Sequence, residues 1–232
     1  MQRSLFLLPF VFIAAAVPAA AQSFDLLSRF SVGGSFVVSQ PKDEFSHNVG
    51  NGYGGQGGVM FHLLRSGLVN LRFDVSGVVY DKEEKLVPLS ETERILFEVT
   101  TTNSIITFTA GPEIARPAGR VRPYANVGYS RLLFRTTSSL KGTSDEVDTT
   151  TTNYSDSTDA WVYSGGVRIP LGSVESPLTL DLGLRYYRGG EASYLREGSI
   201  RDHFDGSISI TPLSSRTPML MYAVGIQFRI PR

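Results

Sequence analysis

The residue types most able to carry out a reaction gather near the carboxyl terminus. An aspartate and a histidine are adjacent there and three serines lie nearby, as Asp202, His203, Ser193, Ser199 and Ser207. A histidine beside a hydroxyl and a carboxylate is the set that activates a serine nucleophile. In a segment rich in Ser and Asp, however, one histidine acquires such neighbours by chance, and spacing alone does not supply the required geometry. We therefore favour a solvent-exposed histidine and expect no enzymatic activity.

The chain offers little to a metal or a cofactor. It has no cysteine, which excludes disulfides, thiolate zinc sites and thiol nucleophiles. The three histidines, His47, His62 and His203, are far apart in sequence and form no local metal motif. The glycine-rich run from Gly54 to Gly58 lacks the Lys-Ser/Thr pair that follows a phosphate-binding loop. We interpret the run as a bend or a place of close strand packing, and we expect neither metal nor cofactor.

Composition indicates a folded, electrically balanced protein. The 232 residues include 22 Lys and Arg against 22 Asp and Glu, and 41% are hydrophobic. The chain therefore has neither the high net charge of a disordered tail nor the excess of basic residues of a nucleic-acid binder. The length suits one domain of barrel or sandwich size, or at most two small domains.

The first residues have the pattern of a secretory signal peptide. Arg3 precedes a nearly unbroken apolar run from Leu5 to Ala16, and Ala19 to Ala21 supply the small residues of a cleavage site. The run is shorter than the ~20 residues of a membrane-spanning helix, which argues against an uncleaved anchor. We predict that residues 1–21 are removed and that residues 22–232 form one exported domain.

The exported part alternates apolar and polar residues with a period of two, which is typical of β-strands. From Leu178 to Leu184 every second residue is leucine, with polar residues or glycine between. Eight such segments are 10 to 14 residues long, near the ~9–11 residues with which a tilted strand crosses a bilayer. They are Phe30–Ser39, Tyr53–Leu64, Leu68–Tyr80, Thr100–Glu113, Arg122–Arg135, Ala160–Pro170, Leu178–Arg188 and Met219–Ile230.

Short and long connections alternate between these segments, so they gather at opposite ends of an antiparallel meander. The four long connections are strongly polar. The connection from Thr136 to Asp159 contains 13 Ser or Thr among 24 residues, and we interpret it as a mobile, solvated loop because this composition cannot bury a core.

Alternation alone does not distinguish a soluble lipocalin-like barrel, which is apolar inside, from a membrane barrel, which is apolar outside. All four lysines, Lys42, Lys82, Lys85 and Lys141, fall in the long connections, whereas the wall of a soluble barrel would carry Lys and Glu. We therefore predict an all-β fold, an eight-stranded antiparallel up-and-down transmembrane β-barrel. An aromatic girdle is expected near the long connections, formed by Tyr80, Tyr129, Phe134, Trp161, Tyr163, Tyr186 and Tyr187.

An eight-stranded barrel has an interior just wide enough for side chains, and the polar strand faces place seven charged residues inside. They are Arg72, Asp74, Glu113, Arg168, Asp181, Arg185 and Arg229. Since buried charges must pair, we predict an Arg–carboxylate network that closes the lower barrel. The alternative is a ligand or ion path through the same charges, because an ionisable residue at membrane depth is a candidate site.

Two motifs indicate a relationship to known proteins. The segment from Arg122 to Tyr129, RPYANVGY, is similar to a strand common among the small eight-stranded outer-membrane β-barrels of Gram-negative bacteria, of the OmpA/OmpX/OmpW type. The last strand resembles the signal that the barrel-assembly machinery reads, through Gly225 and Phe228, with Ile230 where an aromatic residue is usual. The architecture of the whole exported part also resembles this group.

The resemblance implies a place in the cell outer membrane, with long connections at the surface and short turns and both termini in the periplasm. It also implies outer-membrane lipids, lipopolysaccharide and the barrel-assembly machinery as partners. We expect a monomer with a structural or surface-interaction role whose surface partner the sequence does not identify. The alternatives are a narrow channel for small apolar molecules, as in OmpW, and, less favoured, an enzyme that modifies lipid A through His203.

Overall fold

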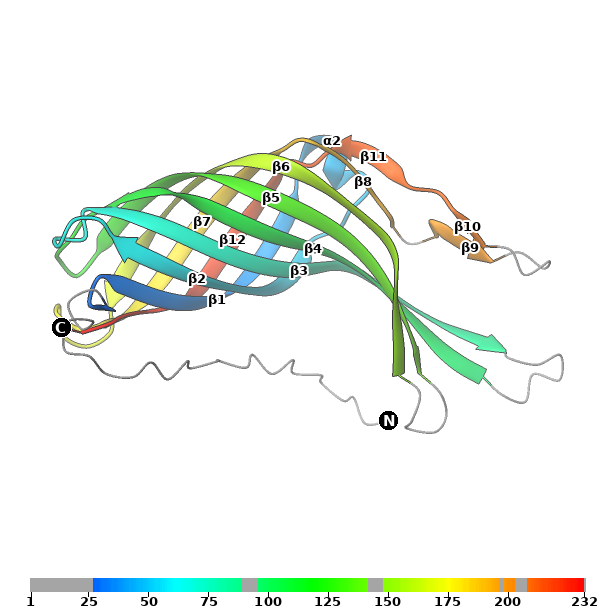
Figure 1. Cartoon of the computed structure of the whole chain (residues 1–232), viewed down its shortest axis with the longest axis horizontal. Coiled ribbons are helices and arrows are strands. Elements are labelled where there is room, and N and C mark those ends of the chain that lie inside the picture. The colour runs from blue at the N-terminus through cyan, green and yellow to red at the C-terminus, as the bar shows by residue number, and fades with distance from the viewer. Residues whose placement is uncertain (1–26, 89–95, 142–147, 197, 203–207, 232) are drawn as a thin grey trace.

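The protein is a closed β-barrel of eight antiparallel strands (Figure 1). The computed structural model describes residues 27–88, 96–141, 148–196, 198–202 and 208–231. The barrel strands are β1 (Phe30–Pro41), β2 (Gly52–His62), β3 (Val69–Pro88), β4 (Leu96–Ala115), β5 (Arg122–Lys141), β6 (Asp148–Pro170), β7 (Leu178–Gly189) and β12 (Met219–Arg229). The predicted barrel and all eight of its strands are thus confirmed, while residues 1–21, the expected signal peptide, lie outside the described residues.

Pairing of the first and last strands completes the cylinder. The register between β1 and β12 runs from Ser31 opposite Arg229 to Pro41 opposite Met219. The other barrel strands pair with their neighbours along the chain. Closure leaves no open sheet edge within the barrel, which a lipid environment demands because it cannot hydrogen-bond to free backbone groups.

Side chains alternate between the outer wall and the lumen. In β12 Tyr222 and Val224 are exposed on the wall, whereas Met221 and Ala223 are buried inside. Large apolar side chains are exposed on the other strands as well, and together they form the outward-facing apolar band that a membrane barrel presents to lipid. No helix among the described residues is long and apolar enough to span a membrane.

Four neighbouring strands continue beyond the barrel as a projecting sheet (Figure 1). The β3–β4 ladder extends to Pro88 opposite Leu96, and the β5–β6 ladder extends to Lys141 opposite Asp148. We call this sheet, which comprises residues 81–88, 96–103, 136–141 and 148–158, the overhang.

The overhang corrects the expectation of a mobile loop from Thr136 to Asp159, because most of that segment is paired strand. Threonine is a β-branched residue that favours strands, and a sheet outside the membrane needs no apolar core on both faces. Three of the lysines, Lys82, Lys85 and Lys141, also lie in strands rather than loops. They belong to the overhang, so the barrel wall itself still carries no lysine among the described residues.

The other long connections also contain regular structure. The helix α2 (Asp43–Ser46) follows β1, and β8 (Glu191–Tyr194), β9 (Ile200–Asp202), β10 (Ile208–Ile210) and β11 (Leu213–Arg216) lie between β7 and β12. β8 pairs with β11, and β9 with β10. The helix α2 and the β8–β11 hairpin meet at the end of the barrel that carries the long connections, here called the surface end. The opposite end, with the three short connections, is the turn end.

Candidate functional site

The lumen is filled by side chains, and Glu113 lies at the centre of its charged layer. This β4 residue is fully buried. Its two carboxylate oxygens accept hydrogen bonds from Nη1 and Nη2 of Arg168 on β6, at 2.8 and 2.6 Å. Arg72 and Asn70, both on β3, each donate a further hydrogen bond at 3.2 Å. Four donors satisfy the carboxylate, as a buried charge requires.

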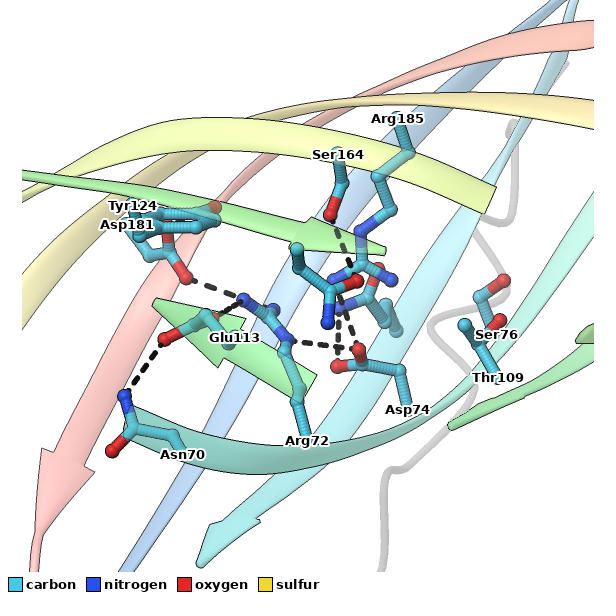
Figure 2. A network of polar contacts seen from close by, with 12 residues as sticks. Asn70, Arg72, Asp74, Ser76, Thr109, Glu113, Tyr124, Ser164, Asp181 and Arg185 are labelled. Carbon is cyan, nitrogen blue, oxygen red and sulfur yellow. Dashed lines mark hydrogen bonds and ion pairs between the residues drawn. The ribbon is translucent and has the colours of Figure 1, made fainter. Parts of the chain in front are cut away.

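Asp74 is the second buried carboxylate of this layer. It accepts a hydrogen bond from Nε of Arg72 at 2.8 Å and lies 3.2 Å from Nη2 of Arg185 on β7. The amide of Gln56 on β2 donates to its other oxygen at 3.0 Å. Arg72 therefore links Asp74 on its own strand to Glu113 on the neighbouring strand, as Figure 2 shows.

Asp181, on β7, is the third carboxylate and is held mainly by a tyrosine. The hydroxyl of Tyr124 on β5 donates to it at 2.8 Å. Arg72 and Arg168 each approach its other oxygen to 3.7 Å. The guanidinium carbon of Arg168 lies 4.1 Å from the centre of the Tyr124 ring, which is a cation–π contact. Tyr124 thus contacts both a carboxylate and a guanidinium group of the network.

Two glycines leave the space that Tyr124 occupies. A Cβ atom added to Gly166 or Gly183 would lie 2.6 or 2.7 Å from the Tyr124 hydroxyl oxygen. Both glycines are paired with each other across β6 and β7. The absence of side chains at these two glycines therefore leaves room for the tyrosine to reach Asp181.

The structure brings six of the seven predicted lumen charges into one buried network of three arginines and three carboxylates. They are Arg72, Asp74, Glu113, Arg168, Asp181 and Arg185. Arg229 lies closer to the turn end, where its Nη2 donates to the backbone carbonyl of Arg65 at 3.3 Å. The sequence reasoning did not include Gln56, Asn70 and Tyr124 in the network. Their inward positions follow from the same alternation, and Tyr124 stands within the RPY motif.

Hydroxyl groups form a thin layer on the surface side of the charges. Ser76 and Thr107 are hydrogen-bonded at 2.6 Å, and Thr109 donates to Ser130 at 2.9 Å. Each of these side chains is buried. The polarity of the lumen therefore decreases from ion pairs to neutral hydroxyls towards the surface end.

Beyond the hydroxyls the lumen is apolar, which the sequence reasoning did not predict. We call the cluster the apolar plug; its members include Val37, Phe45, Val78, Ile105, Leu132, Phe134, Tyr187, Tyr194, Met219 and Met221. Phe45 of α2 packs edge-on against Phe134 of β5 and Tyr194 of β8, with ring centroids 5.9 and 5.1 Å apart. The short helix and the hairpin thus complete the plug at the surface end.

The plug also corrects the predicted aromatic girdle. Tyr80, Phe134 and Tyr187 are buried inside, whereas Tyr129, Trp161 and Tyr163 are exposed on the wall. Consecutive residues such as Tyr186 and Tyr187 must point to opposite faces of a strand, so the seven aromatic residues could not all face lipid. Tyr129 and Trp161 form an edge-to-face pair with centroids 5.8 Å apart.

Arg131, on the apolar wall beside that aromatic pair, carries its own counter-ion. Its Nη1 atom lies 2.8 Å from Asp159 of β6, and both side chains are about half exposed. The Nη2 atom donates to Ser157. This placement at the top of the wall fits the low cost of a charge near the membrane interface.

The three residues of the predicted assembly signal have distinct surroundings. A Cβ atom on Gly225 would lie 2.2 Å from the carbonyl oxygen of Gly34, so the close approach of β1 requires glycine. Phe228 is exposed on the wall. The amide of Ile230 donates to the carbonyl of Phe30 at 3.0 Å, just past the end of β12. Their recognition by assembly machinery stays a prediction.

The candidate nucleophile–base set is only partly described. His203 and Ser207 lie outside the described residues, as does the side chain of Asp202. The backbone amide of Ser193 donates to Asp156, and the hydroxyl of Ser199 accepts from the amide of Arg196. Within the described ranges no three His, Asp or Glu side chains form a group able to hold a metal ion.

The chain is similar to several solved structures and to a family model. No curated protein has a significant sequence match to the chain. Similar solved structures include Neisserial surface protein A (12% identity, TM-score 0.45, 86% of this chain and 96% of that one). They also include Ail, the attachment invasion locus protein of Yersinia pestis (11%, 0.44, 86% and 96%), and OprG of Pseudomonas aeruginosa (9%, 0.47, 86% and 94%).

A family model described as the outer membrane protein beta-barrel domain matches residues 6–207. This match spans most of the chain and includes seven of the eight barrel strands. The expected location in the cell outer membrane is therefore confirmed. The chain belongs to the outer membrane protein β-barrel domain family.

Proposed function

We propose that the protein is a non-conducting outer-membrane barrel that serves at the cell surface through its overhang and long connections. The observation that carries the proposal is the filled lumen. The buried network of three arginines and three carboxylates crosses the barrel, and the apolar plug lies above it. An ion would have to pass paired charges and then a dry apolar layer, and both steps are unfavourable.

The surface-interaction role is supported by the overhang. Its outermost strands, the ends of β3 and β6, have no barrel strand beside them beyond Val79 and Ala160. Free strand edges expose backbone donors and acceptors that can pair with an extended segment of another protein. The polar Ser- and Thr-rich composition keeps this sheet soluble in its unbound state.

Single-channel recording in planar bilayers tests the closed lumen. We expect the refolded protein to give a quiet membrane at potentials at which a general porin gives steps. Discrete conductance steps from the wild-type protein would contradict the proposal. A general porin inserted in the same apparatus provides the positive control.

Transport of small apolar molecules is the second candidate, and one feature of the wall favours it. The β4–β5 pairing is interrupted at Gly111 and Pro112, where proline supplies no backbone donor. The two strands are in close approach here, since a Cβ atom on Gly111 would lie 2.2 Å from the carbonyl oxygen of Val127, so an apolar molecule could leave the lumen sideways only if they separate. Uptake of a small apolar dye into vesicles that contain the protein, compared with vesicles without it, distinguishes this candidate from a barrel with no transport.

We also propose that the protein is not an enzyme and functions as a monomer surrounded by lipid. The support for a lipid surround is the band of exposed apolar side chains on the wall. Mass analysis of lipid A from cells with His203→Ala tests the absence of catalysis, since a changed lipid A profile would indicate an enzyme. Cross-linking in native membranes tests the monomer.

A further inference from the structure

A groove lies on the outside of the barrel at the surface end, where β5, β6 and β7 meet the long connections. Its volume is about 610 Å³, and we call it the wall groove. The barrel strands contribute three aromatic residues to its lining, Tyr129, Trp161 and Tyr186. Because Tyr129 and Trp161 are exposed on the wall, the groove faces the surroundings of the barrel and not the lumen.

Two of these aromatic residues form an open corner. Tyr129 and Trp161 lie directly opposite each other in the β5–β6 ladder, and each side chain is about half exposed. Their ring planes are inclined at 81°. Exposed aromatic faces at such a corner attract ammonium groups, in the manner of the aromatic cages that bind choline.

Two arginines and two carboxylates also line the groove. Arg188 is the neighbour of Trp161 in the β6–β7 ladder, Arg216 of β11 lies opposite Glu191 of β8, and Asp43 is the first residue of α2. All four side chains are exposed. No ion pair or hydrogen bond joins any two of these four residues, so both charges of each sign are available to a ligand.

The balance of charge limits the chemistry of that ligand. A further lining carboxylate, Asp159, is already paired with Arg131 at 2.8 Å. A purely anionic group would meet the two remaining carboxylates, and a purely cationic group would meet the two arginines. A group with both a phosphate and an ammonium suits all four, because guanidinium groups donate paired hydrogen bonds to phosphate and carboxylates and aromatic faces attract ammonium.

We propose that the wall groove binds the headgroup of a zwitterionic phospholipid of the surrounding bilayer. Exposed aromatic residues such as Tyr129 and Trp161 mark the membrane–water interface, where headgroups lie. The apolar wall continues from the groove towards the middle of the membrane through Tyr163 and Leu184, both exposed, so the acyl chains can pack there. The site is separate from the lumen and the overhang, so its failure would leave the proposed surface function in place.

Fluorescence of Trp161 tests the site directly, because the chain has one tryptophan. The folded protein in uncharged maltoside micelles is titrated with short-chain phosphatidylethanolamine. A parallel titration uses phosphatidylglycerol of the same chain length, which has the phosphate but no ammonium.

Two double variants remove the two halves of the site. Arg188→Gln with Arg216→Gln removes the guanidinium groups, and Asp43→Asn with Glu191→Gln removes the carboxylates. The matched control, Arg135→Gln with Arg196→Gln, removes two exposed arginines that do not line the groove.

We expect a saturable change with phosphatidylethanolamine in the wild type and the control, and an affinity at least about tenfold lower for phosphatidylglycerol. The arginine variant should bind phosphatidylethanolamine at least about tenfold more weakly, and the carboxylate variant should bind the two lipids with similar affinity. A change that never saturates, equal affinity of the wild type for both lipids, or an arginine variant that matches the control would each overturn the proposal. Heat-modifiable gel migration verifies folding, and Arg188→Gln alone is the substitute if the arginine variant does not fold.

Discussion

Glu113 shows how one side chain can organise a membrane-embedded lumen. It has no contact with solvent, and it accepts hydrogen bonds from residues on β3 and β6. A carboxylate so placed is stable only because two guanidinium groups surround it. Conversely, Glu113 balances the charge of Arg168 and, together with Asp74 and Asp181, that of Arg72.

The first prediction follows from this mutual dependence. Glu113→Gln keeps the shape of the side chain but removes the charge that balances Arg168 and Arg72. We expect it to lower the free energy of unfolding by roughly 3–5 kcal/mol, because breaking a buried ion pair leaves uncompensated charge. Urea unfolding in lipid vesicles measures the effect. Glu175→Gln, at an exposed turn, should change stability by less than about 0.5 kcal/mol, and equal effects of the two variants would argue against the network.

A second prediction concerns the hydroxyl of Tyr124. Tyr124→Phe preserves the ring that contacts Arg168 but leaves one oxygen of Asp181 without its donor. The expected loss of stability is about 1–3 kcal/mol, the cost of an unsatisfied buried acceptor. Tyr163→Phe on the exposed wall is the matched control and should lie within about 0.5 kcal/mol of wild type. A Tyr124→Phe variant as stable as this control would show that the hydroxyl contributes nothing.

At the scale of elements, the bilayer explains which strands were predictable. Within the membrane each strand must present apolar residues to lipid at every second position, so β7 and β12 are recognisable from alternation alone. Outside the membrane no such requirement acts. The upper halves of β5 and β6 lack a period-two pattern of apolar residues, and only the strand preference of threonine indicates their structure.

The overhang leads to the third prediction. Backbone amides of residues 136–139 should exchange slowly with deuterium, because β5 pairs there with both β4 and β6. The exposed turn from Gly172 to Glu175 should exchange fast and serves as the internal reference. Peptide-resolved hydrogen exchange by mass spectrometry measures both regions. Equally fast exchange in the two regions would restore the interpretation of Thr136–Asp159 as a mobile loop.

For the whole molecule, the alternation of side chains between the two faces of each strand predicted part of the contents of the lumen. This alternation identifies which charged residues point inward, and six of those residues form the network. The alternation does not identify the apolar plug. Leu132 and Phe134 point inward, but they are as apolar as the residues that face lipid, so the sequence does not distinguish the two faces there. The plug also depends on Phe45 and Tyr194, which come from connections that no periodic pattern describes.

The charged network and the apolar plug act as two barriers in series, so we predict that opening either one alone leaves the barrel non-conducting. Glu113→Ala with Arg168→Ala removes a pair of opposite charges from the first barrier, and Phe45→Ala with Phe134→Ala truncates the second. Current through barriers in series is limited by the tighter one, and a dry apolar constriction excludes ions even where it is not fully packed. Only the fourfold variant should therefore give discrete steps in planar bilayers, whereas steps from the Glu113–Arg168 double variant alone would show that the plug does not seal the lumen.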